Sequence, residues 1–476
     1  VSELNLSGKG TFENPRVQGD IALSNLRIKE KPLEDIHLRV SLQDQLAKVT
    51  GKLNFGVEGS YHLQKKDFLA SLQFEKTDLT PYLKLANQSD LSGNLTGRIK
   101  AGGNVGAIDR IRADADLSDF KLFFKEKEMI RSQDFKASFK NGEISLPSVL
   151  LRLLTDGHLK VEGKVNPKGA LGLRVNGDIP LSVVKPFLQD IPDIKGNLSI
   201  NADIKGNPSD PKLNAKIDLK NIGMTVPGLM QQLHNLNGKI QITPDSATIV
   251  EPIKGQLDSG QIELKGSAGL KKFLPTWMKV DLRTNALPIN VPDTLEILLN
   301  TELKLRGTME ASTLAGEAVI LEGRYYKDVE LSLLSSLKTV VKKKRETAPQ
   351  ASTSPNPFLK NMKLDISVKR RNPFVVENNL ALLDIQPDLE VTGTATQPLI
   401  GGRAKIETGT ITYQKKKFEV NKGVIDFLNP YKIEPTLDIE SESKVREWVI
   451  TLKVSGTPDE LSFNLTSVPP EDHGDI

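Results

Sequence analysis

The sequence contains no cysteine, which excludes disulfides, thiol catalysis and thiolate metal sites. Aromatic residues make up only 5% of the chain. This content is low for a protein with compact cores, which depend on large aromatic side chains. Because no run of about 18 apolar residues occurs, we expect neither a transmembrane helix nor a signal peptide in this stretch. The 64 Lys and Arg residues nearly balance the 60 Asp and Glu residues, so the chain carries no basic footprint for nucleic acid.

Residue patterns for catalysis are missing as well. The five histidines are scattered through the chain, and none is spaced from another as metal ligands are. No phosphate-binding loop and no nucleophile-elbow motif occurs. We therefore expect no enzyme activity, no metal and no cofactor. The histidines are His37, His62, His158, His234 and His473.

What the sequence does contain is alternation of apolar and polar residues, which is clearest between Leu389 and Phe427. Alternation with a period of two predicts strands with one dry face and one wet face. Small residues such as Gly393, Gly409 and Gly423 interrupt it, which is typical of reversals between strands. Similar segments begin at Leu4, Leu91, Ile194 and Leu303, and a last one runs from Ile450 to Leu465. The segments that begin at Leu4, Leu91, Ile194, Leu303 and Leu389 recur at roughly 90–105 residues, which indicates a loose array.

Four short segments are helix candidates, three of them with a proline at or near the start, where the missing N–H costs nothing. They are Leu79–Ala86, Leu181–Gln189, Leu229–Asn235 and Asp293–Leu299. Each is too short to be stable alone, so we expect it to plug or cap the sheet. Residues 338–357 hold a basic cluster followed by a Ser-, Thr- and Pro-rich run, which predicts a flexible loop.

The number of strands decides between architectures. About a dozen residues per strand and turn gives on the order of 30–40 strands, more than one flat open sheet normally holds. We expect an all-β fold in which a long curled antiparallel ribbon forms an open groove with an aliphatic interior. An ordinary β-sandwich remains the alternative, although it predicts bulkier inner residues. The candidate lining residues are Leu213, Ala215, Ile217, Leu219, Ile262, Leu264, Leu364, Ile366, Val368, Ile406, Ile411, Val424, Phe427, Leu452 and Val454.

The C-terminal third resembles the TamB family. The resemblance rests on the order and spacing of several short motifs over about 100 residues. The motifs begin with Asn372-Pro373-Phe374-Val375-Val376 and Leu389-Glu390-Val391-Thr392-Gly393-Thr394, and continue with residues 402–411, 418–427 and 435–439. They end with Val454-Ser455-Gly456-Thr457 and Ser467-Val468-Pro469-Pro470.

This resemblance implies a β-groove with a hydrophobic interior in the periplasm, held at the inner membrane by an N-terminal anchor that we expect before residue 1. It implies phospholipids as cargo and an outer-membrane barrel protein of the TamA type as partner. We divide the chain into groove units over residues 1–337, the loop 338–357, and a TamB-type domain over residues 358–476 that continues the groove.

Three functions remain open. The favoured one is a conduit that moves phospholipids between the inner and outer membranes. The second is a scaffold or chaperone for outer-membrane protein and autotransporter assembly, acting through an exposed sheet edge. The third is a structural or adhesive array, which would have a sharper period.

Overall fold

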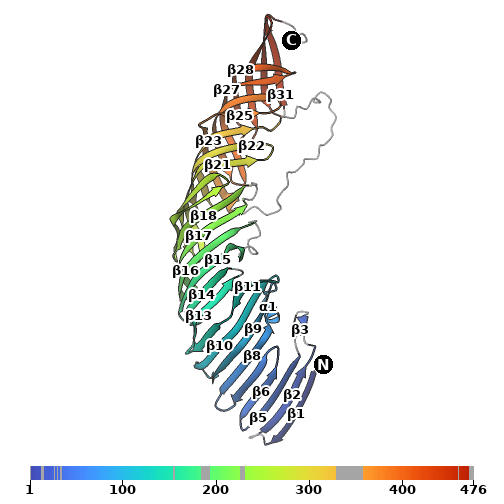
Figure 1. Ribbon diagram of the computed structural model, residues 1–476, viewed down its shortest axis with the longest axis vertical. Coiled ribbons are helices and arrows are strands. Elements are labelled where there is room, and N and C mark those ends of the chain that lie inside the picture. The colour runs from blue at the N-terminus through green and yellow to red at the C-terminus, as the bar shows by residue number, and fades with distance from the viewer. Residues whose placement is uncertain are drawn as a thin grey trace. The chain divides into compact units, whose positions relative to one another are not determined.

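The computed structural model describes all residues except 1, 12–14, 26, 29–30, 33–34, 154–155, 184–192, 226–230, 329–356, 459 and 471–476. The protein is 78% strand, and 29 strands belong to one mixed sheet (Figure 1). The all-β expectation is confirmed, and the 31 strands found among the described residues fall within the expected range. No helix among the described residues is long and apolar enough to cross a membrane.

The chain forms two compact units, which we describe separately. The first consists of residues 1–189, 194–220 and 241–244. The second consists of residues 190–193, 221–240 and 245–476, and strands β17 and β18 contribute residues to both. The loop boundary expected at 338–357 lies mostly outside the described residues.

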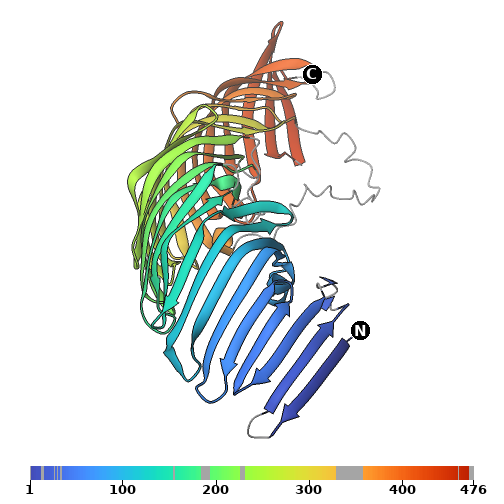
Figure 2. The ribbon, with the colours of Figure 1, turned by 60° about the horizontal axis from the view of Figure 1, so that its bottom comes forward.

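In the first unit, the strands pair in antiparallel fashion and mostly with their neighbours in the chain, as the successive blue and teal arrows of Figure 2 show, while β2 pairs with β5, and β3 and β4 form a separate two-stranded sheet. The strands are β1 (Ser2–Gly10), β2 (Pro15–Leu23), β3 (Arg27–Ile28), β4 (Lys31–Pro32), β5 (Ile36–Gln43), β6 (Leu46–Lys52), β7 (Gly56–His62), β8 (Asp67–Asp78), β9 (Leu91–Asn104), β10 (Ala107–Phe124), β11 (Lys127–Ser132), β12 (Phe135–Lys140), β13 (Glu143–Leu153), β14 (Gly157–Val165), β15 (Leu171–Pro180), β16 (Lys195–Asn207) and most of β17 (Asp210–Thr225).

Two helical segments lie against the sheet of the first unit. The α-helix α1 (Thr80–Leu85) has Pro81 in its first turn and fulfils the expectation for Leu79–Ala86. The ring centroids of Tyr82 in α1 and Phe55 are 6.4 Å apart, and Phe55 in turn packs against Phe74. A 3₁₀ turn, η1 (Leu181–Val183), buries Val183 beside Met129 and Leu153, while the rest of the candidate Leu181–Gln189 lies outside the described residues.

The second unit contains the remaining strands and one short helix. They are β18 (Gln232–Ile242), β19 (Ser246–Leu257), β20 (Gly260–Lys271), β21 (Leu274–Val291), β22 (Leu295–Gly307), β23 (Ser312–Tyr325), α2 (Pro357–Asn361), β24 (Met362–Arg370), β25 (Phe374–Glu377), β26 (Ala381–Thr394), β27 (Gln397–Tyr413), β28 (Lys416–Phe427), β29 (Pro435–Val445), β30 (Trp448–Thr457) and β31 (Glu460–Val468).

Three sequence expectations are wrong in this unit. Asp293–Leu299 is not a helix, because most of it belongs to β22, where alternate side chains enter the apolar face. The described part of Leu229–Asn235 extends into strand β18. The sheet is also not purely antiparallel, since β23 pairs in parallel with β24 and β25. Parallel pairing requires a long crossover connection, and residues 326–356 separate these strands in the sequence.

Candidate functional site: the apolar face of the sheet

One face of the second unit is apolar from β19 to β31. Paired residues of neighbouring strands point to the same side of a sheet, so the register identifies which residues share a face. Leu264 pairs with Leu282, and Leu282 pairs with Leu303. Leu303 pairs with Gly316, which pairs with Ile366, and Ile366 pairs with Val391. The face therefore consists of aliphatic side chains aligned across consecutive strands.

A row beside it contains the polar exception. Ile262 pairs with Thr284, and Thr284 pairs with Thr301. The two threonine hydroxyls lie 2.9 Å apart and form a hydrogen bond with each other, and the Thr301 N–H donates to the Thr284 hydroxyl. The two threonines thus place their hydroxyl groups against each other within the apolar face.

The apolar face is half-exposed over β20 to β24. Ile262, Leu264, Leu364, Ile366 and Val368 all keep an intermediate exposure, although their side chains are aliphatic. Nearby, burial raises the pKa of Tyr325, which shares this face through its pairing with Leu295. This stretch is thus a low-polarity surface that its own side chains do not fully cover.

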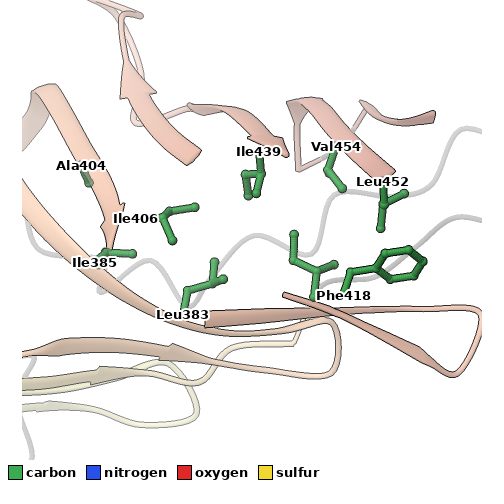
Figure 3. Packing of buried hydrophobic residues seen from close by; sticks show 9 residues of the cluster. Leu383, Ile385, Ala404, Ile406, Phe418, Ile439, Leu452 and Val454 are labelled. Carbon is green, nitrogen blue, oxygen red and sulfur yellow. The ribbon is translucent and has the colours of Figure 1, made fainter. Parts of the chain in front are cut away.

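The same face closes on itself over β26 to β31. Figure 3 shows side chains from these strands pointing toward one another in a single packed cluster. Tyr413 on β27 and Phe463 on β31 stack with ring centroids 4.9 Å apart. In a flat sheet four strand spacings would place them roughly 19 Å apart, so the sheet is strongly curled here. The buried members of this C-terminal cluster are Leu383, Ile385, Ala404, Ile406, Ile411, Phe418, Ile439, Leu452 and Val454.

Glycines allow the strands of the C-terminal cluster to approach closely. A Cβ at Gly423 would lie 2.6 Å from Ile406 Cδ1 and 3.2 Å from Ile439 Cγ2. Only a residue without a side chain fits between these two isoleucines. The cluster is therefore packed to the density of a core, and leaves no room for a ligand at this point.

The opposite face carries charged side chains that pair across strands. Lys254 and Glu263 lie 3.6 Å apart, as do Arg283 and Glu302. The side chains of Arg306 and Asp281 are hydrogen-bonded, which lowers the pKa of the Asp281 carboxyl. Such exposed pairs add little stability, but their charges keep this face of the sheet in contact with solvent.

Two hollows on this charged side are bordered by charged and polar residues. A hollow of about 1190 Å³ in the second unit is lined by residues that include Gln261, Glu263, Arg283 and Glu302. In the first unit a hollow of about 680 Å³ is bordered by Lys48, Glu58, Lys100 and Arg112 among others. Neither resembles the apolar surface on which a hydrocarbon chain would rest. Among the described residues, no group of three or more His, Asp or Glu side chains could hold a metal ion.

Within the second unit, the structure brings all of the predicted lining residues except Val424 onto one face. Leu213, Ala215, Ile217 and Leu219 alternate along β17 within the first unit. In the second unit, Phe427 pairs with Gly402 and shares the apolar face with Ile406. Four predicted residues belong to the closed C-terminal cluster rather than to an open wall, because the sheet curls over them: Ile406, Ile411, Leu452 and Val454.

Val424 lies on the other face. It pairs with Lys405, the residue before Ile406, whereas Gly423 pairs with Ile406. The register of β28 shifts between Val420 and Lys422, so the simple alternation read from Phe418 fails beyond that point. Ile425 takes the inward place that the sequence assigned to Val424.

Sequence reasoning missed several members of the C-terminal cluster. Leu383, Ile385 and Phe418 are buried in it, and Leu437 and Phe463 pack against it. Period-two alternation was a usable signal for Ile385, Phe418, Leu437 and Phe463, whose neighbours on both sides are polar, whereas Leu383 follows another leucine. Which strands meet across the curl had no signal in the sequence.

Comparisons with known proteins agree with this architecture. A family model described as the TamB C-terminal domain matches residues 251–476. Protein TIC236, chloroplastic, from Arabidopsis thaliana is 19% identical over 300 residues, which cover 61% of this chain. The aligned region spans only 13% of that relative's length.

The matched residues include all of β20 to β31, and hence the half-exposed stretch and the closed C-terminal cluster. The match to the TamB domain favours a periplasmic, envelope-associated protein. Residues 251–476 are thus similar to the TamB C-terminal domain, in agreement with the family that the sequence motifs indicated.

Proposed function

We propose that the apolar face carries the acyl chains of phospholipids as they move between the inner and outer membranes. The observation that supports this most directly is the half-exposed aliphatic surface of β20 to β24, where Leu264 and Ile366 lie in one cross-strand row. Half-buried aliphatic side chains aligned over several strands leave a continuous apolar surface, and apolar surface gathered in this way marks a binding site. The role is carriage and involves no catalysis.

The energetics favour this use of the face. Each CH₂ group of an acyl chain costs about 0.8 kcal/mol in water, and on the order of 10 kcal/mol accumulates over a whole chain. A continuous aliphatic surface removes most of that cost along the path. Because no aromatic ring or charge interrupts the row from Leu264 to Val391, a chain can slide without a deep trap.

The closed C-terminal cluster limits where the lipid can lie. Leu452 has no exposed surface, and Val454 is 4% exposed. An acyl chain on β20 to β24 would have to displace these packed side chains to continue along the same face. In the proposed path, lipid therefore leaves the apolar face before it reaches the C-terminal cluster, unless that cluster opens.

Photo-crosslinking tests the proposed path. A benzophenone amino acid at Leu264 or Ile366 should crosslink to phospholipid in cells, and one at Ser367 should not. Ser367 is the matched control because it follows Ile366 in β24 and points to the charged face, where it lines the polar hollow. Equal labelling from both positions, or none from either, would exclude an acyl chain on this face.

A charge in the path provides the functional test. Ile366→Arg places an unpaired ion on the apolar face, which is costly where a hydrocarbon chain must pass. Lipid transfer between vesicles or in cells should fall at least tenfold, whereas Ser367→Arg should transfer normally. Circular dichroism checks that both variants are folded. Normal transfer by a folded Ile366→Arg chain would contradict the proposal.

A second function rests on a different feature, the last strand. In the described part of the chain, β31 is hydrogen-bonded only to β30, so its other edge presents unpaired backbone groups. Such an edge can add a strand from a client or partner, as expected for a scaffold of outer-membrane protein assembly. Crosslinks from Asn464 to nascent barrel strands, with no lipid labelling at Leu264, would favour this function.

A further inference from the structure

The hairpin formed by β20 and β21 extends beyond its neighbours. The pairing of β19 with β20 ends at Ser246 and Gly269, and that of β21 with β22 begins at Met278 and Gly307. Between these points, β20 and β21 pair only with each other, apart from one backbone hydrogen bond from Leu270 to Asp245. The tip therefore projects several residues past the adjacent strands of the second unit.

Large apolar side chains cover this tip. Phe273 is 50% exposed, Leu274 is 69% exposed and Trp277 is 47% exposed. A side chain at Gly269 would collide with the indole of Trp277, which lies over that glycine. Three neighbouring residues thus expose aromatic and aliphatic surface at the end of one hairpin, where turn residues are ordinarily polar.

The turn conformation makes the choice of residues more informative. Lys272 and Phe273 both have positive φ, at 51° and 65°. A two-residue turn of this kind is satisfied best by Asn-Gly or Asp-Gly, and a bulky residue with positive φ is an outlier. Other turns of this sheet place polar pairs there, such as Asp44-Gln45 and Gln414-Lys415. Phenylalanine at the tip is unfavourable for the isolated turn, so its use points to a contact made by the ring.

The positive charges around the tip indicate which kind of partner the tip contacts. Lys271 and Lys272 are exposed next to Phe273, and neither forms an ion pair with any residue that the structure describes. Aromatic and aliphatic side chains flanked by lysines are the combination that enters the interface of an anionic bilayer. The indole of a tryptophan is suited to the same depth, between head groups and acyl chains.

We infer that the β20–β21 hairpin tip is a membrane-docking element that inserts Phe273, Leu274 and Trp277 into the surface of an anionic lipid bilayer. This goes beyond acyl-chain carriage, because the tip would hold the protein against a membrane whether or not lipid moves along the apolar face. The insertion is shallow, since only the end of the hairpin is apolar.

Tryptophan fluorescence tests this inference directly. The chain has two tryptophans, so the difference between the chain and its Trp277→Phe variant isolates Trp277. Vesicles of phosphatidylethanolamine with one quarter phosphatidylglycerol should shift the Trp277 emission to the blue, and brominated lipids should quench it. Vesicles of phosphatidylcholine alone should bind more weakly, because Lys271 and Lys272 then lack anionic partners.

Variants separate insertion from folding. Phe273→Asn suits the positive φ of the turn, and Leu274→Ser removes the most exposed leucine of the tip. Together they should lower partitioning onto anionic vesicles at least tenfold without lowering the midpoint of thermal unfolding. Leu69→Ser is the matched control, because Leu69 is 68% exposed in the first unit, and it should bind vesicles normally.

Two results would overturn the inference. One is equal vesicle binding by the double variant and the unchanged chain, or no binding by either. The other is self-association without lipid that the double variant loses, which would make the tip a contact between copies. Lipid crosslinking at Leu264 is a separate measurement: it should persist in the double variant, so failure of docking and failure of the proposed carriage are distinguishable.

Discussion

The aromatic rings of Tyr413 and Phe463 stack at a centroid separation of 4.9 Å with an interplanar angle of 19°. The two residues belong to β27 and β31, with three strands between them in the sheet. The two strands are therefore connected in two ways, by the hydrogen bonds that run through the three strands between them and by direct packing of the two rings across the curl. It also makes the curl of the second unit accessible to mutation.

Removing this stack should loosen the curl. We expect Tyr413→Ala and Phe463→Ala each to cost about 1–3 kcal/mol, less than a fully buried aromatic residue, because both rings are half-exposed. A double-mutant cycle should give a coupling of about 0.5–1.5 kcal/mol. Urea unfolding followed by tryptophan fluorescence reports the second unit, which holds both tryptophans. Tyr431→Ala is the control, since Tyr431 is 88% exposed, and a coupling near zero would contradict a supporting role for the stack.

The C-terminal cluster should respond strongly to lost volume. Leu452 is fully buried, so Leu452→Ala should lower the free energy of unfolding by about 2–5 kcal/mol. Leu428 is 74% exposed, and the matched change Leu428→Ala should cost less than about 0.5 kcal/mol. The same unfolding measurement compares them. Similar losses in the two variants would mean that the C-terminal cluster is not a packed core in solution.

Added volume in the C-terminal cluster should also be harmful. A methyl group at position 423 would press on Ile406 and Ile439, so Gly423→Ala should destabilise by about 1–3 kcal/mol. No atom lies within 4 Å of the Cβ position at Gly401, so Gly401→Ala should be neutral or mildly stabilising. Melting temperatures of the two variants provide the comparison. A Gly423→Ala chain as stable as the unchanged protein would show that the strands can separate there at little cost.

The pH dependence of stability should include Asp426. Hydrogen bonds of 2.6 and 3.0 Å from the Arg403 guanidinium lower the pKa of the Asp426 carboxyl. A carboxyl whose pKa is lower in the folded state contributes stability above its unfolded pKa of about 3.9 and loses it as pH falls through the folded value. Asp426→Asn should therefore flatten the acid limb of the unfolding midpoint below about pH 4. Carboxyl NMR titration of Asp426 gives a direct check, and an ordinary pKa would contradict the pairing.

Local sequence signals predicted many of the strands and the faces of their side chains, but they did not predict the shifts in strand register. Alternation predicted the strands of β20, β24 and β30, and it placed Leu264, Ile366 and Leu452 on the apolar face of their strands. It misplaced Val424, because a register shift after Val420 inverts the faces beyond it. A different signal, Pro292 at the start of a short segment, favoured a helix at Asp293–Leu299. The segment belongs instead mostly to strand β22, whose side chains pack on the apolar face.

The sequence by itself determined that the protein is all-β, that one face of its sheet is aliphatic and the other charged, and that its C-terminal part is similar to the TamB family. These properties depend on residue type and on a period of two, and both are local. Only the tertiary structure decided where the aliphatic face stays half-exposed and where it closes into a core. That difference depends on how far the sheet curls, which brings Tyr413 to Phe463 and buries Leu452, while Leu264 and Ile366 remain half-exposed. Curl accumulates from twist and side-chain volume over many strands, so no single segment of the sequence encodes it.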